Sequence, residues 1–143
     1  MKKIQLTCAH AIVKYLISQK ILVDGKKLPL FAGAFGIFGH GNVACLGQAL
    51  EESKNELPTW RGHHEQNMAL TGIAYSRAKR RKQIFVATSS VGPGSTNMLT
   101  AAAVAMSNRL PMLFLPGDTF ANRMPDPVLQ QVEHFNNPNV TQN

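Results

Sequence analysis

Three continuous apolar runs, separated by helical patterns, constrain the fold of this chain most strongly. They span residues 30–38, 84–88 and 112–115, and a shorter candidate strand at 58–62 lies between the first two. A strand that is buried on both faces shows such a continuous run, whereas a half-buried strand alternates. Strands that alternate with helices form a parallel sheet with helices on both faces. The sequence therefore predicts an α/β fold, a three-layer α/β/α arrangement around a mainly parallel sheet.

Apolar residues spaced by three and four predict the helices between these strands. Thr7 and Asn42 are favoured N-cap residues for the first two helices. The third helix begins at Glu65 and ends at the basic run 77–82. Each of these helices has one apolar stripe, which it can pack against the sheet.

Loops are indicated by small residues and by glycine and proline. Asp24-Gly25 predicts a turn, and residues 89–96 form a loop of small residues before an alanine-rich helix over 97–108. Residues 126–133 indicate the start of a further helix.

Length and composition fit one globular domain. The 143 residues are 44% hydrophobic and 16% charged, and no apolar run is long enough to cross a bilayer. The N-terminal residues lack the apolar core of a signal peptide. We therefore expect a cytoplasmic protein with no membrane association. Cys8 and Cys45 fit no metal or redox spacing, so we expect free thiols.

The basic run 77–82 carries much of the formal net charge of +7. One interpretation is a surface for nucleic acid or an acidic partner. The other is the C-terminus of a helix, where cations interact favourably with the helix dipole. No aromatic residue is interleaved with the run and no nucleic-acid motif surrounds it. The sequence therefore favours the helix end, and we expect no nucleic-acid partner.

Three polar or glycine-rich segments follow the predicted strands, at residues 39–42, 63–66 and 92–97. In open α/β sheets, ligands bind outside the carboxyl ends of the strands. We therefore expect the three segments to lie together at one edge of the sheet, around a binding site.

Glu65 is the most informative residue of these segments. It opens a helix on the same face as Met68 and Ala69, which places a carboxylate at the edge of the core. Burial raises the pKa of a carboxyl group and a helix N-terminus lowers it, so the sequence alone does not give the sign. The alternative is a plain first-turn glutamate that the helix dipole stabilises.

Two further interpretations of these segments find less support. The glycines of 92–97 before a helix suggest a phosphate-binding loop, but the lysine of a Walker loop is absent and Pro93 lacks a backbone donor. His63 and His64 are adjacent and lack the spacing of helical metal ligands. We expect no metal site on them.

Several motifs resemble those of the trihydroxycyclohexanedione hydrolases, a family of the acetolactate synthase-like thiamine-diphosphate enzymes. Glu65 together with the run Gly92–Asn97 resembles the wider group, whereas GIFGHGN (36–42) and PDPVLQQ (125–131) point more narrowly to the hydrolases. The resemblance extends from about Ile4 to His134. Its segments are 35–42, 46–50, 64–69, 88–98, 108–111, 115–118 and 125–131.

The resemblance implies that residues 1–143 belong to an N-terminal, pyrimidine-binding domain. A glutamate at the position of Glu65 hydrogen-bonds the aminopyrimidine ring of thiamine diphosphate and so promotes proton removal from the thiazolium ring. His40 is implied as a catalytic proton shuttle or a substrate hydrogen-bond partner. The implied cofactor-binding residues are Glu65, Gly92, Pro93, Gly94, Thr96 and Asn97. The implied substrate-side residues are Gly39, His40, Gly41 and Asn42.

The implied reaction is hydrolysis of a carbon–carbon bond, which opens the cyclic diketone trihydroxycyclohexane-1,2-dione to 5-deoxy-glucuronate in myo-inositol catabolism. The family holds Mg²⁺ and the diphosphate on a third domain with Gly-Asp-Gly, and here Gly117-Asp118 is followed by Thr119. We therefore expect a domain incomplete at its C-terminus, without the middle and diphosphate-binding domains, and inactive alone.

The same resemblance implies a homo-oligomer or a partner that carries the diphosphate domain. Two other functions stay open. One is a fragment of an acetolactate synthase-like lyase or synthase. The other is a non-catalytic pyrimidine-domain module that needs a separate partner chain.

Overall fold

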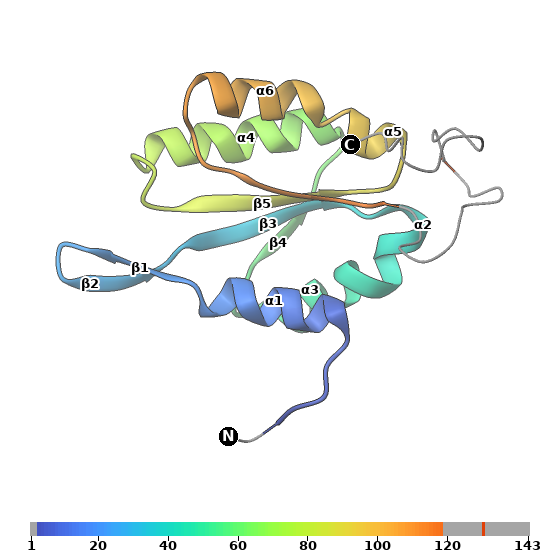
Figure 1. Ribbon diagram of the computed structural model, residues 1–143, viewed down its shortest axis with the longest axis horizontal. Coiled ribbons are helices and arrows are strands. Elements are labelled where there is room, and N and C mark those ends of the chain that lie inside the picture. Colours follow the sequence, from blue (N-terminus) through green and yellow to red (C-terminus); the bar gives the residue numbers. More distant parts are fainter. Residues whose placement is uncertain (1–2, 119–129, 131–143) are drawn as a thin grey trace.

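The computed structural model describes residues 3–118 and 130, and its helices and strands alternate along the chain (Figure 1). The helix start expected at 126–133 lies, apart from Gln130, outside the described residues. The elements in chain order are α1 (Cys8–Ser18), β1 (Lys20–Val23), β2 (Lys26–Pro29), β3 (Phe31–Ile37), α2 (Gly39–Asn42), the π-helical turn η1 (Val43–Gly47), α3 (Gln48–Glu52), β4 (Thr59–Arg61), α4 (Glu65–Ala78), β5 (Ile84–Ser89), α5 (Pro93–Thr96), α6 (Leu99–Ser107) and β6 (Leu113–Pro116).

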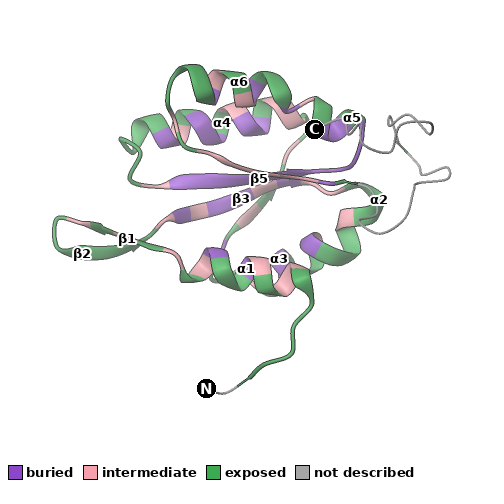
Figure 2. Ribbon diagram, viewed as in Figure 1, coloured by how far each residue is buried: buried purple, intermediate pink, exposed green. Residues whose placement is uncertain are grey.

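The main sheet has four strands in the order β4-β3-β5-β6, and every neighbouring pair is parallel. Ala34 pairs with both Thr59 and Val86, which places β3 between β4 and β5. All six residues of β5 are buried, as its apolar run predicts for a central strand (Figure 2). The predicted parallel sheet is confirmed.

Helices cover both faces of this sheet, which gives the predicted three layers (Figure 1). One face packs against α1, η1 and α3, and this core includes Val13, Leu50 and Val86. The other face packs against α4 and α6, and this core includes Met68 and Ala101. No helix within residues 3–118 has the length and apolar character needed to span a bilayer.

The first and third predicted helices begin and end as their sequences indicate. The Thr7 hydroxyl accepts a hydrogen bond from the His10 backbone N–H at 3.2 Å, so Thr7 caps α1. The buried face of α4 includes Met68 and Ala69, and the helix ends at Ala78 with Lys79 as its C-cap, inside the basic run. The helix-end interpretation of that run therefore agrees with the geometry.

An exposed hairpin of β1 and β2 was not predicted beyond its turn. Asp24 and Gly25 have φ of 49° and 77°, and the strands pair antiparallel from Lys20↔Pro29 to Val23↔Lys26. Every residue of β2 is exposed (Figure 2). Because the hairpin buries little, its strands lack the apolar pattern by which the other strands were recognised.

Two predicted helix starts were wrong. Asn42 does not cap a helix, because α2 already begins at Gly39 and the Asn42 side chain donates to the Ser89 carbonyl at 2.9 Å. The loop expected over 89–96 contains the one-turn helix α5, which begins at Pro93, where the fixed φ of proline favours a first turn. The alanine-rich helix α6 begins only at Leu99, so Asn97 lies between two helices.

Candidate functional site

The three segments singled out in the sequence lie at the carboxyl edge of the sheet, as expected. Residues 39–42 follow β3, 63–66 follow β4 and 92–97 follow β5. From β3 the chain passes to β4 on one side, and then across to β5 on the other side. The carboxyl ends of β3 and β5 therefore form a topological switch point, where open α/β sheets bind ligands.

Glu65 and Asn97 are joined across this edge. The Asn97 Nδ2 donates a hydrogen bond of 2.8 Å to Glu65 Oε2. Glu65 is the first residue of α4, after β4, whereas Asn97 follows α5, after β5. Because α4 and α6 are neighbours on one face of the sheet, this bond joins the N-terminal end of α4 to the residue that lies between α5 and α6. It holds a half-buried carboxylate at the positive end of a helix of 14 residues.

A cleft of about 510 Å³ opens beside this carboxylate. Gly94 leaves room in it, because a Cβ at Gly94 would lie against the Ser90 hydroxyl and 3.3 Å from Glu65 Oε1. Within the described residues Oε1 accepts no hydrogen bond, so it can accept one from a molecule in the cleft. The lining residues are Glu65, Ser90, Pro93, Gly94, Thr96, Asn97 and Gln130.

The loop beside the carboxylate is held by its own hydroxyl groups. The Thr96 Oγ1 and the Ser95 Oγ donate to the Gly92 carbonyl at 2.8 and 3.2 Å. Gly92 has φ of 70°, in the left-handed region that favours glycine, and it packs against the backbone of Gln130. The loop therefore offers a fixed backbone wall to the cleft rather than free hydroxyl donors.

Residues 39–42 touch the wall of the cleft through Ser90. Gly39 has φ of 63°, and a Cβ there would collide with the Ser90 side chain. His40 and Gly41 are exposed. No residue of 39–42 is among the described residues that line the Glu65 cleft.

Ser90 is the site residue that the sequence did not single out. It is buried, it lines the cleft, and both Gly39 and Gly94 pack against its side chain. The available signal in the sequence was its position directly after a buried strand and just before the glycine-containing segment 92–97. Gln130, which was recognised only as part of a motif, lines the same cleft.

His63 and His64 lie in a smaller cavity of about 290 Å³ beside Arg61 and the first turns of α4. Both histidines are exposed, and His64 precedes α4 without a side-chain capping bond. Across residues 3–118 no three His, Cys, Asp or Glu side chains come together as a metal site would require.

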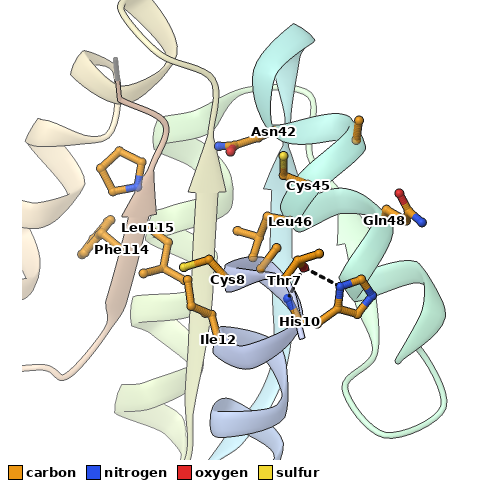
Figure 3. A pocket seen from close by; sticks show the side chains of 13 residues that line it. Thr7, Cys8, His10, Ile12, Asn42, Cys45, Leu46, Gln48, Phe114 and Leu115 are labelled. Carbon is orange, nitrogen blue, oxygen red and sulfur yellow. Dashed lines mark hydrogen bonds between the residues drawn. The ribbon is translucent and has the colours of Figure 1, made fainter. Parts of the chain in front are cut away.

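A larger pocket, of about 540 Å³, lies away from Glu65, between α1, η1 and β6 (Figure 3). Its lining includes Leu115 and the two free, exposed thiols, Cys8 and Cys45. Asn42 also lines it, so that residue faces this pocket rather than the Glu65 cleft. Because its lining is largely apolar and holds no carboxylate, the polar Glu65 cleft is the better candidate for chemistry.

Comparison with known proteins finds a match to one protein family and a set of similar proteins that are much longer than this chain. Residues 31–137 match the family described as "Thiamine pyrophosphate enzyme, N-terminal TPP binding domain". The chain is also similar to proteins named 3D-(3,5/4)-trihydroxycyclohexane-1,2-dione hydrolase. The one from Geobacillus thermodenitrificans is 54% identical over all 143 residues, and the one from Listeria innocua is 53% identical over 99% of the chain. The chain spans 22% of each relative, about a fifth of its length.

Proposed function

Because the chain belongs to the family of N-terminal cofactor-binding domains of thiamine pyrophosphate enzymes, we propose that it supplies the pyrimidine-binding half of the active site of a carbon–carbon bond hydrolase. Glu65 is the residue on which the proposal rests. Its carboxylate is fixed at one oxygen by Asn97 and faces an open cleft with the other.

The cleft fits the aminopyrimidine end of thiamine diphosphate. A flat, nitrogen-rich ring needs a carboxylate partner and a close backbone wall, and Gly94 leaves the space that a side chain would fill. In the proposal the protonated Glu65 carboxyl donates from Oε1 to a ring nitrogen, and the backbone of Gly92, Pro93 and Gly94 borders the ring. Asn97 holds Glu65, and Thr96 fixes the loop through the Gly92 carbonyl.

Bound there, the cofactor would act as the electron sink for cleavage beside a carbonyl group. The role of this chain is to bind the pyrimidine ring, to orient it and to hold a proton at Glu65. Low solvent access around a half-buried carboxylate strengthens such a hydrogen bond. His40, exposed on α2, is proposed to reach the substrate as a proton shuttle or a hydrogen-bond partner. Gly39, Gly41 and Asn42 complete the proposed substrate side.

We propose trihydroxycyclohexane-1,2-dione as the substrate, which is supported by the names of the relatives. The resemblance in 36–42 supports a reaction in myo-inositol catabolism, and we propose the cytoplasm as its compartment. Mg²⁺ and the diphosphate would be held by the parts of the relatives that this chain does not match. A second copy or a partner domain is then needed to complete the active site.

The test is a chimera in which these 143 residues replace the matching segment of the Geobacillus thermodenitrificans relative. We expect the chimera to hydrolyse the cyclic diketone when thiamine diphosphate and Mg²⁺ are present. Glu65→Gln in this chimera should lower turnover by about 100-fold or more, because Gln cannot hold the proton that a general acid or base exchanges. Turnover is measured as the rate at which the ring of the cyclic diketone opens.

The matched control is Glu51→Gln, which changes an exposed glutamate on α3 that pairs with Lys54. It should leave turnover unchanged. A folded, cofactor-loaded chimera in which Glu65→Gln is as active as the parent would refute the role of Glu65. A chimera that binds the cofactor but converts pyruvate instead of the cyclic diketone would refute the substrate and favour a synthase.

A further inference from the structure

The helices α4 and α6 end in the same way, and in each an arginine directly follows the C-cap residue. In α4 the Arg81 N–H bonds the Ser76 carbonyl and the Arg80 N–H bonds the Arg77 carbonyl. In α6 the N–H groups of Leu110 and Arg109 bond the carbonyls of Ala105 and Met106 in the same register. Both are Schellman ends, whose left-handed position usually holds glycine.

Arginine occupies that left-handed position in both helices. Arg80 and Arg109 each have φ of 52°, and Arg81 follows with φ of 63°. Side chains other than glycine, asparagine and aspartate are uncommon there. A cap alone would be served better by glycine, so the side chain of Arg80, which lines a cavity, calls for another explanation.

Within the basic run 77–82, the lysines and the arginines have different surroundings. The Lys79 ammonium lies 5.5 Å from the centre of the Tyr75 ring, and Lys82 Nζ lies 4.0 Å from Asp24 Oδ2. The arginines Arg77, Arg80 and Arg81 instead line one cavity of about 340 Å³, together with Asn108 and Leu110. Within the described residues none of the three arginines forms an ion pair.

One of these guanidinium groups is already held in place. The Arg81 Nε donates to the Arg109 carbonyl at 2.8 Å, which ties the turn after α4 to the turn after α6. Asn108 is fixed too, because its Nδ2 donates to the Val104 carbonyl at 2.9 Å. The remaining guanidinium donors of Arg81 are therefore oriented before any ligand arrives, which lowers the entropy lost on binding.

We propose that this cavity binds the phosphate group of a small phosphorylated molecule. Three guanidinium groups match the charge and the several oxygens of a phosphate dianion better than those of a single carboxylate. The turns that form the cavity precede β5 and β6, at the end of the sheet away from α5 (Figure 1). The site is therefore separate from the Glu65 cleft and does not depend on the proposed function.

The test uses inorganic phosphate as the probe and the whole 143-residue chain. Phosphate should raise the thermal midpoint above the value in potassium chloride or potassium acetate at equal ionic strength. In NMR titrations it should shift the Arg81 Nε–H and the backbone amides of Asn108 and Leu110. Arg80→Gly, Arg77→Gln and Arg81→Gln should each weaken phosphate binding by about tenfold.

Arg109→Gly is the matched control for Arg80→Gly. Both variants remove one charge from a Schellman end and place glycine in the left-handed position, so without phosphate their thermal midpoints should change alike. Arg109 does not line the cavity, and its variant should bind phosphate as the parent does. Equal phosphate affinity in Arg80→Gly and Arg109→Gly would overturn the proposal. So would equal effects of phosphate, acetate and chloride, or shifts spread equally to Lys26 and Lys27.

Discussion

Asn97 donates a hydrogen bond of 2.8 Å to Glu65, although the two residues lie 32 positions apart and in connections that follow different strands, Glu65 at the start of α4 and Asn97 after α5. The strands that precede these two connections, β4 and β5, are separated in the sheet by β3. The bond leaves the second carboxylate oxygen toward the cleft. The orientation of Glu65 therefore depends on where the residue after α5 is placed, and this can be tested directly.

Asn97→Ala should lower the free energy of unfolding by about 1 kcal/mol, because a half-buried carboxylate loses a donor. In the chimera it should also lower turnover, because Glu65 is then free to turn. Asn67→Ala, at an exposed position of α4, is the control. Urea unfolding and the rate of ring opening measure the two effects. An Asn97→Ala variant that matches the Asn67→Ala control in both would show that Asn97 does not position Glu65.

Gly94→Ala should both destabilise the domain and fill the cleft. The added Cβ would meet the Ser90 hydroxyl, and overpacking of this kind costs about 1–3 kcal/mol. Ser90→Ala in the same chain removes that oxygen and should recover most of the loss in stability. It should not restore cofactor binding, because the new methyl group still lies beside Glu65. Urea midpoints of the two single variants and the double variant measure the recovery, and a strictly additive result would contradict the contact.

The layers of the fold could be predicted because burial on both faces leaves a continuous apolar run. The runs around β3, β5 and β6 each became a strand of the parallel sheet, and the face of Met68 and Ala69 became the buried face of α4. In the hairpin of β1 and β2, every residue of β2 is exposed and no residue of β1 is buried, so its sequence carries no continuous apolar run and only its turn was found.

The site could be predicted only in part, because its contacts depend on the order of the strands. Alternation of strands and helices predicts a parallel sheet but not that β3 lies between β4 and β5. The Glu65–Asn97 bond and the position of Ser90 follow from that order. The sequence likewise could not show that Asn42 bonds the Ser89 carbonyl, since asparagine after a strand is equally typical of a helix cap.

The pair of His10 and Glu52 should make stability depend on pH. Hydrogen bonds from His10 and then from Gln48 lower the pKa of Glu52 below its usual value. A lowered pKa stabilises the fold at pH values above the usual pKa of glutamate, about 4.3, and this contribution is lost as the pH falls through the lowered value. Glu52→Gln should therefore be less stable than the parent near pH 7, and the gap should close below about pH 4.

His10 is the main cause of this shift, so the gap should shrink when His10 is absent. The comparison is Glu52→Gln against the parent chain, and the same change in a His10→Gln background. Urea midpoints at about pH 7, 5, 4 and 3 give both gaps. A gap that is equally large and equally pH-dependent in the two backgrounds would show that the bond of 2.8 Å between His10 and Glu52 does not cause it.

Gly33→Ala should be the most damaging of the small substitutions in the sheet. A Cβ at Gly33 would lie 2.7 Å from the Pro58 carbonyl oxygen and 3.1 Å from the Phe85 ring, and against the Trp60 ring. Trp60 is 47% exposed and can swing away, but the Pro58 carbonyl is backbone and accepts a bond from Ala34 at 2.9 Å. We expect a loss of about 2–3 kcal/mol on urea unfolding, with β4 displaced from β3.

Two further variants separate the causes. Gly41→Ala adds the same methyl group at a helical position with nothing within 4 Å, so it should leave stability unchanged or raise it slightly. Trp60→Ala combined with Gly33→Ala should recover little, because the backbone clash with Pro58 remains. If the double variant recovered the full loss in stability, the clash at Gly33 would be with the indole ring of Trp60 and not with the backbone of Pro58. The edge of the sheet at β4 would then be held by an adaptable side chain rather than by the path of its backbone.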